Sequence, residues 1–180
     1  IALVDGRIHL ADIGDNDRKR TSVQVYVFDE PEPGTATDAG ISEIDTIELT
    51  YPDEPTDAEA LLVDPLSDEV VILSKDLDNG TASTRIYSFA MPDVSTDIST
   101  DGATSADSGT PIEMDFVGEI DVAGLESQAT EFTVTAVLFP GLLTAADIST
   151  DGRLIAVRTY GTVWLYPRLD GQTMAEALQG

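Results

Sequence analysis

The sequence predicts an all-β fold, and two features of the chain point to it. Short segments of alternating apolar and polar residues recur along the 180 residues, and turn residues such as Asp-Gly and Asp-Pro separate them. An alternation with a period of two is typical of strands that bury one face. The apolar content of 42% is sufficient for a core of ordinary size. We therefore expect a folded domain made of short antiparallel strands.

Three groups of strands along the chain share the same order of features. In each group one strand ends in a polar turn, a strongly β-branched strand follows, and a third strand carries an aromatic residue. The first two strands of the groups are IALVDGRIHLADI (1–13), ALLVDPLSDEVVILSK (60–75) and AADISTDGRLIAVRTY (145–160). The third strands are VQVYVF (23–28), RIYSFA (85–90) and VWLYPR (163–168). Antiparallel units that recur in this way predict the blades of a β-propeller.

The single domain divides into about three four-stranded antiparallel blades, at residues 1–51, 57–122 and 143–168. Residues 92–111 are rich in Ser, Thr, Asp and Gly and lack periodicity, so we expect an exposed loop there. Residues 170–179 carry Ala, Met and Leu at helical spacing and predict a short C-terminal helix. A closed propeller needs about four or more blades. Three blades would thus be part of a larger ring, completed by further sequence or by another protein chain.

The charge balance restricts the partners of the protein. The chain carries 34 Asp and Glu against 9 Lys and Arg, which gives a formal net charge of −25. Such a surface repels phosphates and anionic lipids, so we expect neither nucleic acid nor a membrane surface as a partner. The dominance of Asp and the presence of only two lysines favour either exposure to high salt or divalent ions, or an acidic secreted protein. No apolar run approaches the roughly 20 residues that span a bilayer, so we expect no membrane insertion.

Four segments resemble a known family. They are ADIGDNDRKR (11–20), VYVFDEP (25–31), YPDEPTDAEALLVDP (51–65) and TAADISTDGRLIAVRTYGTVWLY (144–166). These segments resemble bacterial extracytoplasmic β-propeller proteins, a largely uncharacterised group related to WD-repeat-like and esterase-like propellers. The resemblance covers nearly the whole chain outside the 92–111 loop. It implies a propeller fold and an extracytoplasmic location, whether periplasmic, secreted or at the cell surface.

Gluconolactonase-like and phytase-like propellers, which this chain resembles in architecture, suggest a metal site. In those propellers an acidic residue at the start of an inner strand binds a metal in the central channel, commonly calcium. By that resemblance Asp57 and Glu59 are the first candidate ligands, because alternation along a strand puts both on one face. Asp147 occupies a similar strand start and is a further candidate. The alternative for Asp57 and Glu59 is a pair of solvated carboxylates.

A second cluster of oxygen ligands lies in ADIGDNDRKR. Asp12, Asp15 and Asn16 are close enough for one turn to present their oxygens to a cation such as Ca²⁺. The alternative is a structural turn, since Asn and Asp side chains hold backbone hydrogen bonds by themselves. Arg18 and Arg20 would pair with these carboxylates and compete with a metal.

One further acidic segment, KDLDNG (75–80), is assigned to a hairpin turn. Asp76 and Asp78 resemble the start of an EF-hand loop, but Gly80 comes one position early and Tyr87 stands where that loop needs its Glu. The sequence thus gives no reason to place Asp76 in a site.

Catalytic signatures are weak. The one histidine, His9, lies on a predicted strand, and the chain contains neither a GxSxG motif nor a phosphate-binding glycine loop. We therefore expect a protein-interaction or structural module with calcium as a candidate stabilising ion. The alternative is a metal-dependent hydrolase of lactones or phosphoesters, whose channel carboxylates would hold a catalytic cation. Unpaired strand edges of an incomplete ring would also bind other chains.

Overall fold

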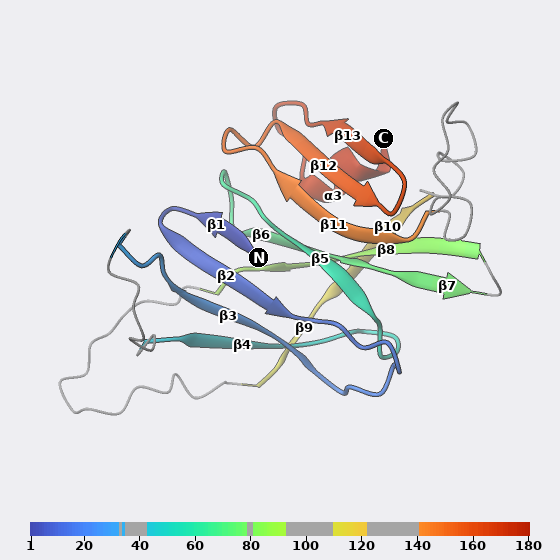
Figure 1. Ribbon diagram of the computed structural model, residues 1–180, viewed down its shortest axis with the longest axis horizontal. Coiled ribbons are helices and arrows are strands. Elements are labelled where there is room, and N and C mark those ends of the chain that lie inside the picture. The colour runs from blue at the N-terminus through green and yellow to red at the C-terminus, as the bar shows by residue number, and fades with distance from the viewer. Residues whose placement is uncertain (33, 35–42, 79–80, 93–109, 122–140) are drawn as a thin grey trace.

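The predicted all-β class is confirmed. The computed structural model describes residues 1–32, 34, 43–78, 81–92, 110–121 and 141–180. Within these ranges the chain forms three mostly antiparallel sheets, none of them closed, which lie one against the next (Figure 1). Nearly all of the loop predicted at 92–111 lies outside the described residues.

The first sheet is an antiparallel meander with a short fifth strand added in parallel. Its order is β1 (Ala2–Val4), β2 (Arg7–Asp12), β3 (Val23–Asp29), β4 (Asp45–Thr50) and β9 (Ile112–Glu113). Asp5 and Gly6 join β1 to β2 with φ of 50° and 73°, the positive values that a two-residue type I′ hairpin turn requires. We expected residues 112–122 in the second unit, but Ile112 pairs with Leu49, so β9 extends the first sheet.

The second sheet lies between the other two. Its order is β10 (Asp115–Ile120), β8 (Thr81–Ala90), β6 (Glu69–Ser74) and β5 (Ala58–Val63), with β7 (Asp76–Asp78) paired to β8. In β6 the side chains of Val70, Val71, Ile72 and Leu73 all have no exposed surface. An unbroken apolar run of this length is expected for a strand covered on both faces. The run therefore makes this sheet the central layer.

The third sheet has three strands rather than the four we expected, within the described residues. They are β11 (Leu143–Ile148), β12 (Leu154–Thr159) and β13 (Val163–Pro167), and α3 (Met174–Gln179) follows inside the range where a helix was predicted. A capping box formed by Thr173 and Glu176 begins the helix. The helix comes so close to β10 that a Cβ on Gly118 would collide with the Gln179 side chain.

Two hydrophobic cores flank the central sheet. The first joins the first and second sheets and includes Val25, Ile47, Leu49, Leu61, Ile72 and Tyr87. The second joins the second and third sheets with α3 and includes Leu62, Val71, Leu73, Ile155, Val157 and Met174. The leading strands of the three sheets, β1, β5 and β11, lie together near the middle of the molecule, with β5 in contact with both others (Figure 1).

An ion pair fastens the central sheet to the third. The Asp64 side chain, just after β5, is fully buried and accepts hydrogen bonds from Arg168 Nη1 at 2.7 Å and Nη2 at 2.8 Å. The Ser67 hydroxyl and the Leu66 N–H donate to the same carboxylate. Burial alone would raise the pKa of Asp64, but the hydrogen bonds and the Arg168 charge outweigh it, so the pKa lies below its usual value.

Replacing Asp64 by Asn should destabilise the protein by about 3 kcal/mol at neutral pH, because the Arg168 guanidinium would stay buried without its counter-charge. The folded pKa lies below the unfolded value of 3.8, so the stabilisation exists above that value and is lost as the pH falls through the folded pKa. Urea unfolding at a series of pH values checks this. The difference between wild type and D64N should shrink in acid, while D170N, which loses an exposed pair with Arg153, should match wild type throughout. A difference independent of pH would contradict the assignment.

Candidate functional site

Polar and charged side chains gather where the first and second sheets meet at one end. Three segments contribute: the loop that follows β2, the residues just before β5, and the residues at the end of β6. Asp15 from the first segment and Asp57 from the second, which are 42 positions apart, are brought into direct contact. The cluster therefore contains members of both predicted metal-binding groups.

Asp57 is the centre of this cluster. It is buried, and its Oδ1 accepts the backbone N–H of Asp15 at 2.7 Å. Its Oδ2 lies 3.6 Å from Lys75 Nζ, and the same ammonium forms an ion pair with Glu59. The two first candidate ligands thus bind one amine of the protein itself.

The state of that amine limits what the cluster can do. Burial by itself would lower the pKa of Lys75, but the hydrogen bond with Glu59 and the charges of Glu59 and Asp57 outweigh it and raise the pKa. Lys75 therefore stays protonated at neutral pH and acts as neither base nor nucleophile. A calcium ion held by Asp57 and Glu59 together would have to displace this ammonium, so the pair does not fit a calcium cage as it stands.

The loop after β2 is closed by its own basic residues. Arg20 Nη1 and Nη2 donate to the Asp12 carboxylate at 2.9 and 3.1 Å, the pairing we expected to compete with a metal. The Asp15 side chain accepts the Arg20 N–H at 2.7 Å, and the Asp15 carbonyl accepts the Arg18 N–H at 2.8 Å. The hydrogen bonds of this loop are those of a structural turn. Asn16 is exposed on it.

The hydrogen bond of Asp147 is local and does not involve this cluster. It is exposed on β11, and its carboxylate accepts the N–H of the next residue, Ile148, at 2.9 Å. Within the part of the chain that the structure describes, no three His, Cys, Asp or Glu side chains form a group that could hold a metal ion. The calcium site stays a prediction.

A fully buried carboxylate, Asp76, which the sequence analysis assigned to a hairpin turn, lies beside the Asp57 cluster. Asp76 Oδ1 accepts from Arg18 Nη2 at 2.7 Å, and its Oδ2 accepts from Arg85 Nε at 2.9 Å and from the Ser74 hydroxyl. Arg18 reaches it from the first sheet with φ of 49°, a value rare outside glycine. Asp76 therefore joins the loop of one sheet to two strands of another.

Arg85 extends the network to the segment before β5. Its Nη1 donates to Asp53 at 2.9 Å, and the Tyr87 hydroxyl donates to the same carboxylate at 3.1 Å. Burial raises the pKa of Tyr87 to about 12, and the carboxylates raise that of Arg85 although burial opposes them. Lys75, Arg85 and Tyr87 all keep their protons at neutral pH, so the network is an inter-sheet clamp rather than a proton-transfer system.

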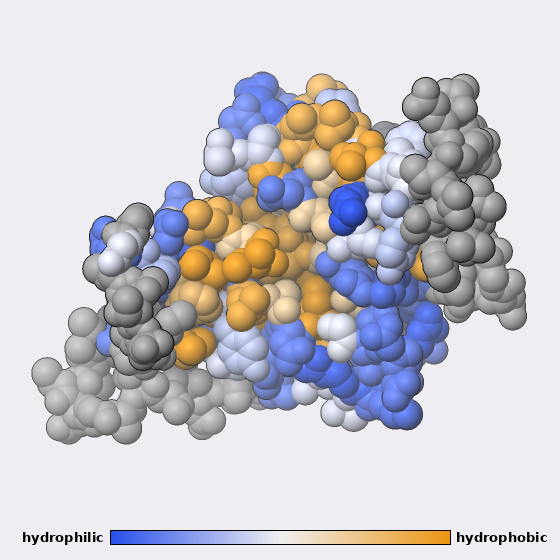
Figure 2. Space-filling model, in the orientation of Figure 1, coloured by the Kyte–Doolittle hydropathy of each residue, from blue (hydrophilic) through white to orange (hydrophobic). Residues whose placement is uncertain are grey.

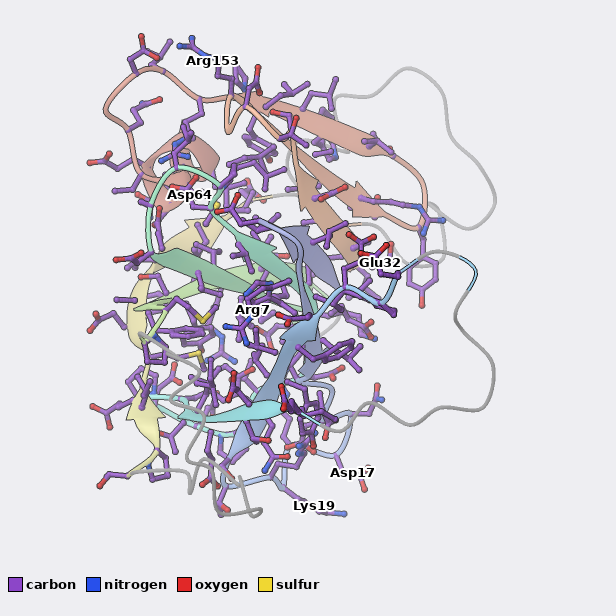
Figure 3. All side chains as sticks on the ribbon, turned by 90° about the vertical axis from the view of Figure 1, so that its left-hand side faces the viewer. Arg7, Asp17, Lys19, Glu32, Asp64 and Arg153 are labelled. Atoms are coloured by element: carbon purple, nitrogen blue, oxygen red, sulfur yellow. The ribbon has the colours of Figure 1, made fainter. Side chains whose placement is uncertain are left out.

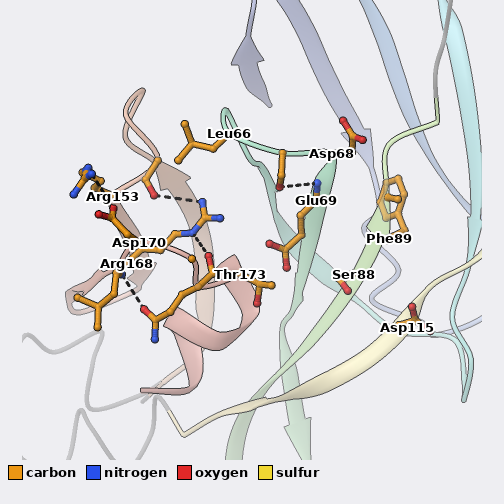
Figure 4. A pocket seen from close by; sticks show the side chains of 16 residues that line it. Leu66, Asp68, Glu69, Ser88, Phe89, Asp115, Arg153, Arg168, Asp170 and Thr173 are labelled. Carbon is orange, nitrogen blue, oxygen red and sulfur yellow. Dashed lines mark hydrogen bonds and ion pairs between the residues drawn. The ribbon is translucent and has the colours of Figure 1, made fainter.

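A separate cavity of about 620 Å³ lies between the central sheet and residues 168–173, the segment that leads into α3 (Figure 4). Phe89, Leu66 and the stems of Glu69 and Arg168 line it. Glu69 accepts the N–H of Met174 at the start of α3 at 2.7 Å, and Arg168 is bound to Asp64. Glu69 and Arg168 are thus engaged in holding the helix and the third sheet.

Comparison of the chain with protein-family models, curated proteins and solved structures gave no match. The resemblance to extracytoplasmic propellers therefore stays a prediction. Among the described residues, no helix has the length and apolar content needed to cross a membrane.

The Asp76 clamp and an exposed ion pair offer a direct comparison of two carboxylates. D76N should lower the free energy of unfolding by about 3 to 5 kcal/mol, because it removes the charge that two guanidinium groups share in a buried place. D17N removes the partner of Lys19, and both side chains of that pair point away from the sheets into solvent (Figure 3). The urea midpoint of D17N should stay at the wild-type value. Equal effects of the two substitutions would contradict the clamp.

Proposed function

We propose that the chain is part of an extracytoplasmic β-propeller that acts as a protein-interaction or structural module. The observation that carries the proposal is the meeting of β1, β5 and β11, the leading strands of three stacked sheets (Figure 1). Propeller blades are antiparallel sheets arranged around a central channel, and each covers the face of the next. The two hydrophobic cores on either side of the central sheet support the same arrangement.

Exposed aliphatic side chains on the outer sheets support an interaction role. Leu3 and Leu10 in the first sheet are 54% and 43% exposed, and Val163 and Leu165 in the third are 56% and 60% exposed. Figure 2 shows hydrophobic residues gathered over β1 and β2 and again over β12 and β13 on one side of the molecule. Apolar areas of this kind mark protein contacts. Further sheets of the same ring, from additional sequence or from another chain, would cover them.

The distribution of charge supports a structural use of the basic residues. Within the described residues, eight of the nine Lys and Arg side chains form ion pairs with Asp or Glu. The surplus of carboxylates, which gives the net charge of −25, is left to interact with dissolved cations or with a basic partner. High salt or millimolar Ca²⁺ would screen or bind this surplus.

Thermal unfolding in EDTA, in millimolar CaCl₂ and in NaCl of matched ionic strength tests the calcium prediction. Because a ligand bound to the folded state stabilises it by mass action, a calcium site should raise the melting temperature by several degrees beyond the NaCl sample. D57N and D147N should then reduce the rise if these residues bind the ion. Identical melting temperatures in CaCl₂ and NaCl would contradict the calcium prediction. The proposal would then be an acidic interaction module without a bound ion.

An assay against lactones and phosphoesters, with and without Ca²⁺, tests the module against the hydrolase. We expect no turnover above the blank, and E59Q should only lower the melting temperature, because Lys75 would lose one of its two charged partners and keep Asp57. Turnover by the wild type that E59Q abolishes, with the variant still folded by circular dichroism, would overturn the proposal in favour of a hydrolase.

A further inference from the structure

We propose that His9 is a pH-sensitive latch between the first sheet and the central sheet. Its neutral imidazole lets the two sheets pack, and its protonation in mild acid releases the first sheet. His9 lies on β2, is only 6% exposed, and is the one histidine of the chain. The inference goes beyond the proposed function, since it depends on the contact between two sheets and not on whether they belong to a ring.

Strand pairing places His9 on the inner face of the first sheet. Its partners on the two adjoining strands are Ala2 in β1 and Val27 in β3. Residues directly opposite each other in an antiparallel pair share one face. Val27 belongs to the core between the first and the central sheet, and Ala2 packs against it. The central sheet adds large aliphatic side chains to the same core, among them Leu61, Val63, Val70 and Ile72.

This apolar layer has no place for a second proton on the imidazole. The Nδ1 atom of His9 is buried and has no hydrogen-bond partner in the described part of the chain. A protonated imidazole carries an N–H on both ring nitrogens. Protonation would therefore put an unsatisfied donor and a net charge between the sheets, and burial of an unpaired charge is costly. The neutral form is the one that fits the packed sheets.

The charged groups around His9 oppose protonation as well. Arg7 lies two residues earlier on the same face of β2, roughly 6 to 7 Å away along the strand. Its guanidinium pairs with Asp45 of β4 at 2.7 Å and with Asp29 of β3 at 3.7 Å, so both carboxylates are already engaged. β1 brings apolar residues to this face, Ala2 and Val4. An imidazolium at His9 would thus be a second cation beside Arg7.

These surroundings lower the pKa of His9. Burial is the largest cause and the Arg7 charge acts in the same direction, while backbone carbonyls of Arg7 and Ala2 oppose them without cancelling them. Tyr51 and Tyr87, which belong to or pack against the same core, stay neutral because burial raises their pKa values.

The lowered pKa couples the contact between the sheets to pH. An unfolded histidine titrates at about 6.5, above the pKa of the packed form, so the released form binds the proton more tightly. The contact is therefore unaffected above about pH 6.5 and weakens as the pH falls toward the lower pKa. In that interval one proton makes opening about tenfold more favourable for each pH unit. Ordinary carboxylates titrate near pH 4, below the start of this window.

A proton NMR titration of the wild type tests the latch without any substitution, because the single imidazole gives one assignable signal. The midpoint of His9 in the folded protein should lie below the midpoint in the urea-unfolded chain, which is expected at about 6.5. A folded midpoint at or above the unfolded one would overturn the inference.

Amide hydrogen exchange from about pH 7 to 5 locates the release. Protection factors in β2 and β3 should fall by up to about tenfold per pH unit. Those in β12 and β13 should change little, because the core that holds the third sheet and α3 does not include His9.

Two variants separate the imidazole from its strand. H9Q keeps a neutral polar side chain that does not titrate, and it should lose the pH response. L10Q changes the next residue of β2, which is 43% exposed, and should keep the response. Equal loss of protection in all three sheets, or a response that H9Q retains, would overturn the inference. If H9Q does not fold, the wild-type titration still decides.

Discussion

The central sheet is buried on both faces, and the other layers are arranged by the need to cover it. Val71 and Leu73 face the third sheet and α3, while Val70 and Ile72 face the first sheet. A strand with no polar face is stable only when both faces are covered. On each face, the apolar area removed from water stabilises the fold by about 25 cal/mol per Å². Neither flanking sheet is buried on both faces. Each packs one face against the central sheet and exposes the other face, which carries both polar and apolar residues. The exposed leucines and valines follow from that asymmetry.

A second constraint is the scarcity of positive charge. Nine cations must serve a chain with 34 carboxylates, and the fold uses three of the arginines at junctions between sheets. Arg168 joins the central sheet to the third, and Arg18 and Arg85 meet on Asp76 between the first and the central sheet. Guanidinium groups suit these positions because their planar donors reach two acceptors at once. Lys75 contacts two carboxylates of its own sheet region, Asp57 and Glu59, with a single ammonium group.

Local patterns predicted the strands well and the clamps poorly, for a physical reason. The apolar run of β6, the Asp5-Gly6 hairpin and the C-terminal helix are encoded within a few residues, and all three are present. The pairing of Asp64 with Arg168 joins positions 104 apart, and no periodicity encodes it. Asp76 was set aside as a hairpin residue because its neighbours did not form an EF-hand. The two arginines that bind Asp76 lie 58 and 9 positions away in the sequence, so the segment around Asp76 carries no signal of the clamp.

The clamps and the surface should respond differently to salt, which ties the composition to the architecture. Surface repulsion among unpaired carboxylates is long-ranged and is screened within about a Debye length, so added salt relieves it. The Asp64–Arg168 and Asp76–Arg85 pairs lie out of solvent at hydrogen-bond distance, where screening is much weaker. Raising the ionic strength therefore removes the destabilising part of the electrostatics while it leaves the inter-sheet ion pairs largely intact. An acidic chain with buried guanidinium clamps is in this way suited to concentrated salt, which agrees with the dominance of aspartate in its sequence.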